Sequence, residues 1–168
     1  MIALVIALAL PWIGSKPNVQ TERHRDGSWT LVRSKNRFTG QSTCAVHGRG
    51  VEVSGNVATL RFPVDVDTSE AWIKIGNENP WPWRKLIPEL RQMNVRLRFD
   101  SLYNPSEGRV ALPVRFLEGA SEVWVAPTTA SAPRRFGVAG LFDALSRAKA
   151  QGCDIAAADT SAPVGDGL

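Results

Sequence analysis

The alternation of apolar and polar residues along this chain predicts a series of short strands. Over residues 57–64, apolar side chains alternate with polar residues or proline, the period of a strand that has one face on a core and one in water. Gly55-Asn56 separates this strand from an apolar, β-branched run over residues 43–53, and the two runs are predicted to form a hairpin. Pro63 cannot donate to a ladder and marks an edge or a strand end. Further strands are predicted from Trp29 and over residues 71–75, 95–99, 110–116 and 123–125.

Two segments carry apolar residues at helical spacing instead. After a loop over residues 76–83, residues 82–93 contain a short helix, which can include Pro88 only in its first turn. The second helix has a stripe formed by Val138, Leu141, Phe142, Leu145 and Ala148. Gly152 follows this helix as its predicted C-cap, and basic residues in the last turn favour the negative end of the helix dipole.

These elements predict a mainly β fold, an antiparallel sandwich or open barrel with the C-terminal helix packed on it. The last three predicted strands, between residues 95 and 125, are expected to form an antiparallel meander. One domain spans residues 28–153, after a polar spacer over residues 16–27 and before a disordered tail over residues 154–168. The length of 168 residues, with 43% apolar and 21% charged residues, fits a single globular domain.

Residues 1–15 form a signal-like apolar segment. Its run is shorter than the roughly 20 residues that span a bilayer as a helix, and it suits the apolar region of a secretory signal. Ala7-Leu8-Ala9 has the small-x-small pattern of a cleavage site, but no basic residue precedes the run. The segment therefore predicts export to the periplasm. The alternative is a cytoplasmic protein that buries this segment as its first strand or helix.

The two cysteines, Cys44 and Cys153, are the first candidates for chemistry. A nucleophilic pair of Cys44 and His47 needs the two side chains in contact, yet residues three apart on one strand point to opposite faces. A structural zinc site wants four ligands. All the cysteines and histidines of the chain would then have to converge: Cys44, Cys153, His24 and His47.

A disulfide between Cys44 and Cys153 requires fewer coincidences. Cys44 begins a strand, and Cys153 follows a helix that must pack on the sheet to bury its stripe. The bond would close a loop of roughly 110 residues, to which chain-entropy models assign about 4–5 kcal/mol. An oxidising compartment favours the bond, whereas a reducing one favours two buried thiols.

Trp72, Trp81 and Trp83 lie close together around a proline-rich loop, and Arg84 follows them. Exposed, these four residues would form an aromatic and cationic platform for an anionic envelope polymer, a glycan or a membrane surface. Buried, the tryptophans would fill the core at the end of a sheet. The pair Asp65 and Asp67, on one face of the predicted strand, could hold a cation but more often belongs to a solvated face.

Charge and motifs narrow the function classes. Lys and Arg number 20 against 16 Asp and Glu, and the resulting net charge of +4 is dispersed and accompanies no nucleic-acid recognition motif. No phosphate-binding loop, G-x-S-x-G or H-E-x-x-H motif occurs, so no catalytic, cofactor or metal residues are assigned. The expected function is non-enzymatic binding of an envelope polymer, a membrane surface or another envelope protein. The alternatives are a small hydrolase with an unrecognised site and a subunit of an envelope assembly that uses Trp81 and Trp83 as an interface.

Two short motifs, at the two ends of residues 28–153, suggest a family. After the first predicted strand, a segment contains Ser34, Lys35, Thr39, Gly40 and Cys44. The closing helix motif contains Phe136, Gly140, Leu141, Ala144, Leu145, Ala148 and, slightly displaced, Cys153. Both motifs resemble those of the invasion-associated locus B family of small periplasmic proteins of alphaproteobacteria. The resemblance implies an envelope β-sandwich-like domain and supplies no catalytic residue.

Overall fold

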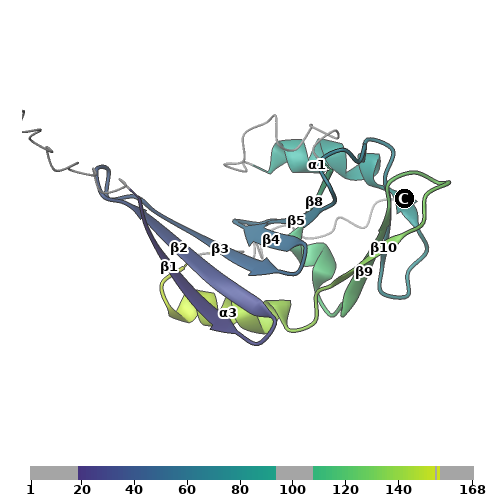
Figure 1. Cartoon of the computed structure of the whole chain (residues 1–168). Helices are drawn as coiled ribbons and strands as arrows, with labels where there is room; N and C mark the ends of the chain where they lie inside the picture. The colour runs from purple at the N-terminus through teal and green to yellow at the C-terminus, as the bar shows by residue number, and fades with distance from the viewer. Residues whose placement is uncertain (1–18, 94–107, 154, 156–168) are drawn as a thin grey trace, which may run out of the picture.

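The computed structural model describes residues 19–93, 108–153 and 155 (Figure 1). Within these residues the chain forms a six-stranded and a four-stranded antiparallel sheet, and helix α3 (Leu141–Ala150) follows the last strand. This confirms the predicted mainly β, antiparallel fold with a C-terminal helix. The signal-like segment, the predicted strand over residues 95–99 and nearly all of the tail predicted over residues 154–168 lie outside the described residues.

The first sheet is built mostly from consecutive hairpins. In spatial order its strands are β1 (Val19–Asp26), β2 (Trp29–Asn36), β3 (Ser42–Gly48), β4 (Val51–Ser54), β5 (Val57–Arg61) and β8 (Arg109–Pro113). The two-residue turn predicted at Gly55-Asn56 is confirmed, because Ser54 of β4 pairs with Val57 of β5. Only β8 breaks the consecutive order, since it returns from later in the chain to pair with β5.

The predicted polar spacer over residues 16–27 is wrong for residues 19–26. These residues form β1, which pairs with the whole length of β2, from Val19 opposite Asn36 to Asp26 opposite Trp29. Gly27 takes the positive φ of +57° that a tight hairpin requires at this turn. Because β1 lies at an edge of the sheet and is exposed, its sequence lacks an apolar alternation. The β domain therefore includes residues before 28.

Two other strand boundaries differ from the prediction. The run over residues 43–53 is divided between β3 and β4 by a turn at Arg49-Gly50, where Gly50 has a φ of +76°. The strand predicted over residues 57–64 ends at Arg61. Pro63 lies just beyond that end, in agreement with its predicted position, and Val64 is exposed.

The second sheet has the order β10 (Arg134–Gly137), β9 (Glu122–Ala126), β6 (Trp72–Ile75) and β7 (Trp81–Pro82). The buried positions of β6 and β9 follow the predicted alternation. The loop predicted over residues 76–83 contains β7, which pairs with β6. β10 was not predicted, because Phe136 is its one buried residue.

The predicted meander between residues 95 and 125 is wrong in its connections. β8 belongs to the first sheet and β9 to the second, and the 3₁₀ helix η3 (Val114–Leu117) follows β8. The strand predicted over residues 110–116 therefore ends at Pro113. β8 also departs from alternation, because Ala111 and Pro113 are buried together with their neighbours. A second layer covers this part of the sheet: 3₁₀ helix η1 (Trp83–Leu86) and helix α1 (Ile87–Gln92), shown above β8 in Figure 1.

The residues predicted to begin one helix and to end the other lie at those positions in the structure. Pro88 lies in the first turn of α1. At the end of α3, the Gly152 and Cys153 N–H groups donate to the carbonyls of Lys149 and Ala148, both at 2.9 Å. This is the Schellman arrangement, and Gly152 supplies its positive φ of +78°. No helix of the described residues is long and apolar enough to cross a membrane.

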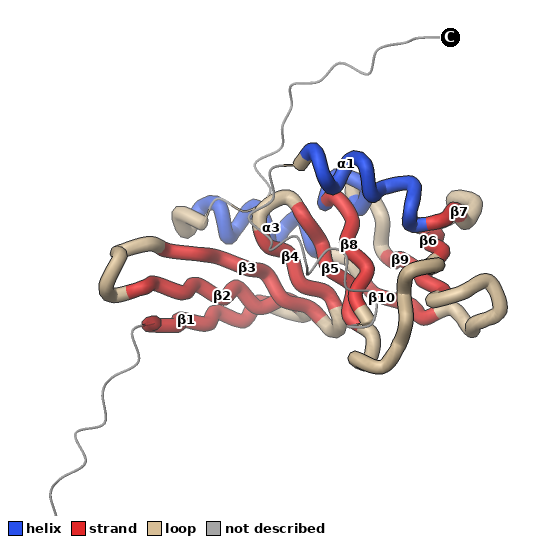
Figure 2. The backbone as a smooth tube through the Cα atoms, turned by 90° about the horizontal axis from the view of Figure 1, so that it is seen from above, coloured by secondary structure: helices blue, strands red, loops and turns tan. Residues whose placement is uncertain are grey.

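Both sheets and α3 contribute to one core. Phe62, just after β5 of the first sheet, meets Phe136 of the second sheet edge-to-face, with ring centroids 5.3 Å apart. Toward the β1 edge of the first sheet, α3 lies across β2 and β3 (Figures 1 and 2). The buried face of α3 follows the predicted stripe and consists of Leu141, Ala144, Leu145 and Ala148.

Candidate functional site

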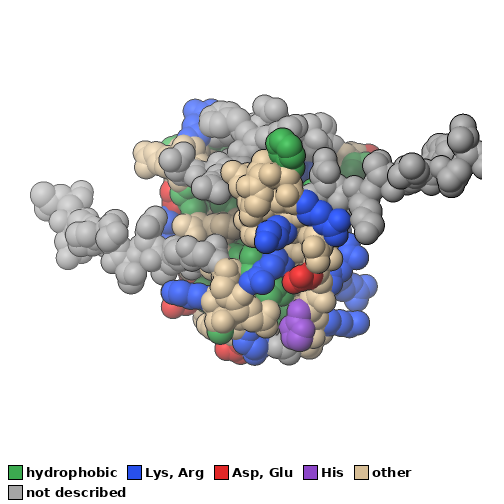
Figure 3. All heavy atoms as spheres, turned by 90° about the vertical axis from the view of Figure 1, so that its left-hand side faces the viewer, with side chains coloured by type: hydrophobic (Ala, Val, Ile, Leu, Met, Phe, Trp, Pro, Cys, Tyr) green, Lys and Arg blue, Asp and Glu red, His purple; other side chains and the backbone are tan. Residues whose placement is uncertain are grey.

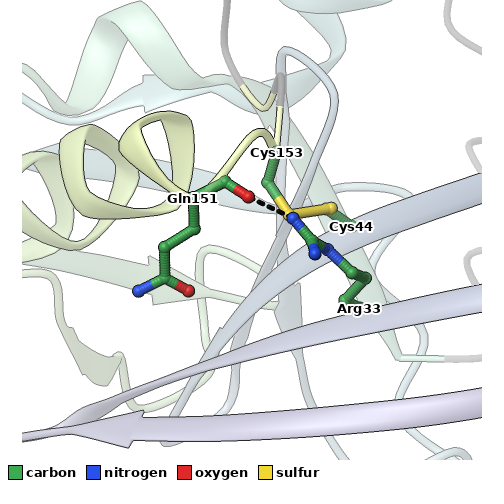
Figure 4. The surroundings of a disulfide bond; sticks show 4 residues. All are labelled: Arg33, Cys44, Gln151 and Cys153. Atoms are coloured by element: carbon green, nitrogen blue, oxygen red, sulfur yellow. Dashed lines mark hydrogen bonds between the residues drawn. A yellow bond between two sulfur atoms is a disulfide. The ribbon is translucent and has the colours of Figure 1, made fainter.

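Cys44 and Cys153 form a disulfide bond, with sulfur atoms 2.04 Å and Cα atoms 5.7 Å apart (Figure 4). The predicted pairing is confirmed. Because both sulfurs are bonded, Cys44 has no thiol to act with His47, and neither cysteine can serve as a zinc thiolate. The alternative of two buried thiols is excluded for the same reason.

The register of the first sheet explains why the cysteines meet. Cys44 lies opposite Arg33 on the face that α3 covers, the face that also carries Leu31 and Val46. The guanidinium of Arg33 donates a hydrogen bond to the backbone carbonyl of Gln151 (Figure 4). The last carbonyls of a helix have no partner within the helix, and a cation suits this negative end. Arg33 and the disulfide therefore hold the same end of α3 on β2 and β3.

The two histidines lie on opposite faces of the first sheet. The Nδ1 atom of His47 is 3.9 Å from Oε2 of Glu52, a carboxylate that also pairs with Arg61. His24 lines a small cleft between the sheet and α3, together with Trp29, Leu31, Val46, Ala144, Arg147, Ala148 and Gln151. Nothing in this cleft assigns a reaction, so the alternative of a small enzyme stays a prediction.

The predicted platform of Trp72, Trp81, Trp83 and Arg84 is not assembled on one surface. Trp83 is only 3% exposed, and its Nε1 donates to the carbonyl of Ala111 at 2.6 Å. Trp83 is therefore a core residue that joins η1 to β8. Arg84 is exposed and forms an ion pair with Glu70.

Trp72 and Trp81 belong to opposite faces of the second sheet. Trp81 lies opposite Ile73, a buried residue of β6, and its ring centroid is 6.2 Å from that of Phe116. Trp72 is the neighbour of Ile73 along the strand, so its side chain points to the other face. The platform was predicted because these residues are close in sequence, whereas strand alternation separates them in space.

The outer face of the second sheet assembles a different set, which we call the tryptophan face: Trp72, Lys74, Trp124 and Arg135. Lys74 of β6, Trp124 of β9 and Arg135 of β10 are direct cross-strand neighbours in one row. Trp72 occupies the next row, opposite Ala126. Trp72, Lys74 and Trp124 are partly exposed, and Arg135 is exposed on the edge strand.

Glu122 organises the centre of the tryptophan face. The indole Nε1 of Trp124 donates to Oε1 of Glu122 at 2.8 Å, and Nη1 of Arg135 lies 3.6 Å from Oε2 of the same carboxylate. The guanidinium carbon of Arg135 is 6.0 Å from the Trp124 ring centroid, within cation–π range. The hydrogen bond between Trp124 and Glu122 holds the indole along β9. The sequence contained one signal for Trp124, its position between the buried Val123 and Val125, but none that linked it to Trp72 or Arg135.

Asp65 and Asp67 do not share a strand face, because β5 ends at Arg61. The Ser69 N–H donates to Oδ1 of Asp67 at 2.8 Å. This backbone hydrogen bond, followed by one from the Ser69 hydroxyl, lowers the pKa of the Asp67 carboxyl. Among the described residues, no group of three or more His, Cys, Asp or Glu side chains is placed to hold a metal ion.

In comparisons with known proteins, no family model, curated protein or solved structure matches this chain. The resemblance to the invasion-associated locus B family therefore stays a prediction that rests on the two short motifs.

Proposed function

We propose that this chain is an extracytoplasmic, non-enzymatic binding domain that holds an anionic envelope polymer on the tryptophan face. The observation that carries the proposal is the cross-strand arrangement of that face, where two indoles lie on one surface with Lys74 and Arg135 beside them. The site differs from the platform predicted from sequence, but it joins the same chemical groups.

The chemistry of the tryptophan face suits a chain of charged sugar rings. Indole rings provide large, rigid contact surfaces that are apolar over the ring and polar at the N–H. Lys74 and Arg135 supply the positive charge that attracts acidic groups on the polymer. The Glu122 carboxylate has acceptor capacity beyond its two contacts and can receive a sugar hydroxyl.

The disulfide supports the extracytoplasmic part of the proposal. Disulfides persist in the periplasm and other oxidising compartments and are rare in the cytosol. The apolar composition of residues 1–15 agrees with export. Envelope polymers are met in that compartment, so the location and the ligand class are mutually consistent.

Binding to a soluble polymer probe tests the proposal. Isothermal calorimetry of the full chain with dextran sulfate should show binding that weakens as salt rises, whereas uncharged dextran should bind far more weakly. Trp72→Ala and Trp124→Ala should each weaken dextran sulfate binding by about tenfold, the size expected for loss of about 1.4 kcal/mol of stacking and cation contact.

Trp81→Ala is the matched control, because Trp81 is also a partly exposed tryptophan of the second sheet but lies on the opposite face. It should leave binding unchanged. If Trp81→Ala weakens binding as much as Trp72→Ala does, or if all three variants bind normally, the tryptophan face is not the site.

A further inference from the structure

The loop between β2 and β3 lies at the end of an arm that extends past the rest of the first sheet. β4 pairs with β3 only from Val46 to Gly48, so the first part of β3 continues beyond β4. Figures 1 and 2 show β1, β2 and β3 reaching away from the body, with this loop at their end. We call residues 35–41 the hairpin tip.

The hairpin tip is a tightly hydrogen-bonded turn. Oδ1 of Asn36 accepts hydrogen bonds from the backbone N–H groups of Phe38 at 2.9 Å and Thr39 at 3.1 Å. The Asn36 N–H donates to the carbonyl of Gln41 at 2.8 Å, and the Gly40 N–H donates to the Asn36 carbonyl at 2.9 Å. The backbone of the tip is therefore held without any contribution from the Phe38 side chain.

That side chain is exposed to solvent at the end of the arm. Phe38 is 89% exposed, the highest value among the large hydrophobic residues that the structure describes as exposed, ahead of Val64 at 77% and Val19 at 47%. Val19 lies at the same end, because it pairs with Asn36. The Phe38 side chain therefore forms an apolar end of the tip, and the turn does not depend on it for its structure.

The surroundings of Phe38 are basic. From Gly27 to Gly48 the sequence has no acidic residue, but it contains Arg33, Lys35 and Arg37. Lys35 and Arg37 belong to the hairpin tip itself. Figure 3 faces this end of the molecule, and Lys and Arg side chains gather on it. An apolar group flanked by cations is the composition of elements that bind anionic lipid surfaces.

The start of β1 places the preceding chain at the same end. Since Val19 lies opposite Asn36, the residues before β1 join the domain beside the hairpin tip. These residues include the continuous apolar run that begins the sequence.

We propose that the hairpin tip is a membrane-contacting element. Phe38 enters the interfacial layer of an anionic bilayer, and Lys35 and Arg37 lie against the lipid phosphates. This contact is separate from polymer binding on the tryptophan face, so either proposal can fail without the other.

A fluorescent label at the tip tests this inference in the full chain. Since the two native cysteines are bonded to each other, Phe38→Cys introduces the one free thiol for an environment-sensitive fluorophore. With phosphatidylcholine vesicles that contain phosphatidylglycerol, the label emission should shift to the blue. Nitroxide-labelled lipids should quench the fluorescence of this label at least about threefold more strongly than they quench the label of the matched control.

The matched control is a label introduced by Val64→Cys. Val64 is also an exposed apolar residue, but it follows the end of β5 that lies beside Gly50, at the opposite end of β3 from the tip. Both labelled chains retain residues 1–18, so any lipid contact of that segment is common to them. Adding Lys35→Ala and Arg37→Ala should reduce quenching at residue 38 by roughly twofold or more.

Three results would overturn the proposal. The first is equal quenching of the labels at residues 38 and 64. The second is equal quenching at residue 38 in vesicles with and without phosphatidylglycerol. The third is a label at residue 38 that stays exposed to water when vesicles are added but is buried when an envelope protein is added. The last result would identify the tip as a protein-binding element.

Discussion

At the residue scale, Trp29 forms one of the most constrained contacts of the molecule. Its side chain is buried between β2 and α3, and its Nε1 donates to the carbonyl of Ala139 at 2.9 Å, just before that helix. The indole lies directly over Gly48 of β3, where a Cβ would come within 2.6 Å of a ring carbon. Gly48 is therefore required for space, and the absence of its side chain allows Trp29 to reach the helix.

Replacing Gly48 with alanine should destabilise the protein by about 1–3 kcal/mol, because the hydrogen bond to Ala139 keeps Trp29 from moving aside. Gly137→Ala is the matched control: Gly137 is also a strand glycine, and a Cβ added there would meet no heavy atom within 4 Å. It should change the free energy of unfolding by less than about 1 kcal/mol. Urea unfolding of the two variants measures the difference. Equal losses of unfolding free energy would show that the Trp29 side chain can move aside at little cost.

At the element scale, α3 is attached to the first sheet at both of its ends. Trp29 holds the segment before the helix, while Arg33 and the disulfide hold the residues after it. Between these attachments, the buried stripe of the helix lies on the sheet. The short helix thus gains its position from tertiary contacts, as expected for a helix of about three turns.

Cys44→Ala and Cys153→Ala should each lower the free energy of unfolding by about 4–5 kcal/mol, because either change opens the same bond across a sequence separation of 109 residues. Denaturation with and without reductant measures this. Reductant should destabilise the wild type and leave both variants unchanged. Mass spectrometry of the protein, purified without reductant, should find the bond intact. Strongly unequal losses would show that one cysteine contributes by packing instead.

At the scale of the whole molecule, one core joins the two sheets. Phe136 is among the largest fully buried side chains and contacts Phe62 from the first sheet. The Arg134 guanidinium lies over both rings, 5.0 Å from the centroid of Phe136 and 5.6 Å from that of Phe62. A core shared in this way predicts that the sheets unfold together.

Phe136→Ala should therefore destabilise both sheets at once, by about 3–5 kcal/mol, the usual cost of removing a buried aromatic ring. Far-UV circular dichroism and tryptophan fluorescence should report one coincident transition. Phe38→Ala removes the same ring from an exposed position and should change stability by less than about 0.5 kcal/mol. Two separate transitions in either protein would contradict a single core.

Much of the candidate site depended on information that local sequence does not carry. Trp72, Trp81 and Trp83 are neighbours along the chain, yet they point to an outer face, an inner face and the core. The tryptophan face instead unites residues from β6, β9 and β10, and β10 was not predicted at all. Alternation shows that Trp124 and Val125 differ in burial, but not which strand lies beside them.

By itself, the sequence determined the fold class, the burial pattern of β6 and β9, and the closing helix with its C-cap. These follow from alternation, helical spacing and turn residues, which act within one element and leave few alternatives. Only the tertiary structure decided that β1 is a strand, that β8 joins β5, and that Trp83 is buried. The reason is physical: an exposed edge strand needs no apolar pattern, and pairing between distant strands depends on neighbours that the local sequence does not specify.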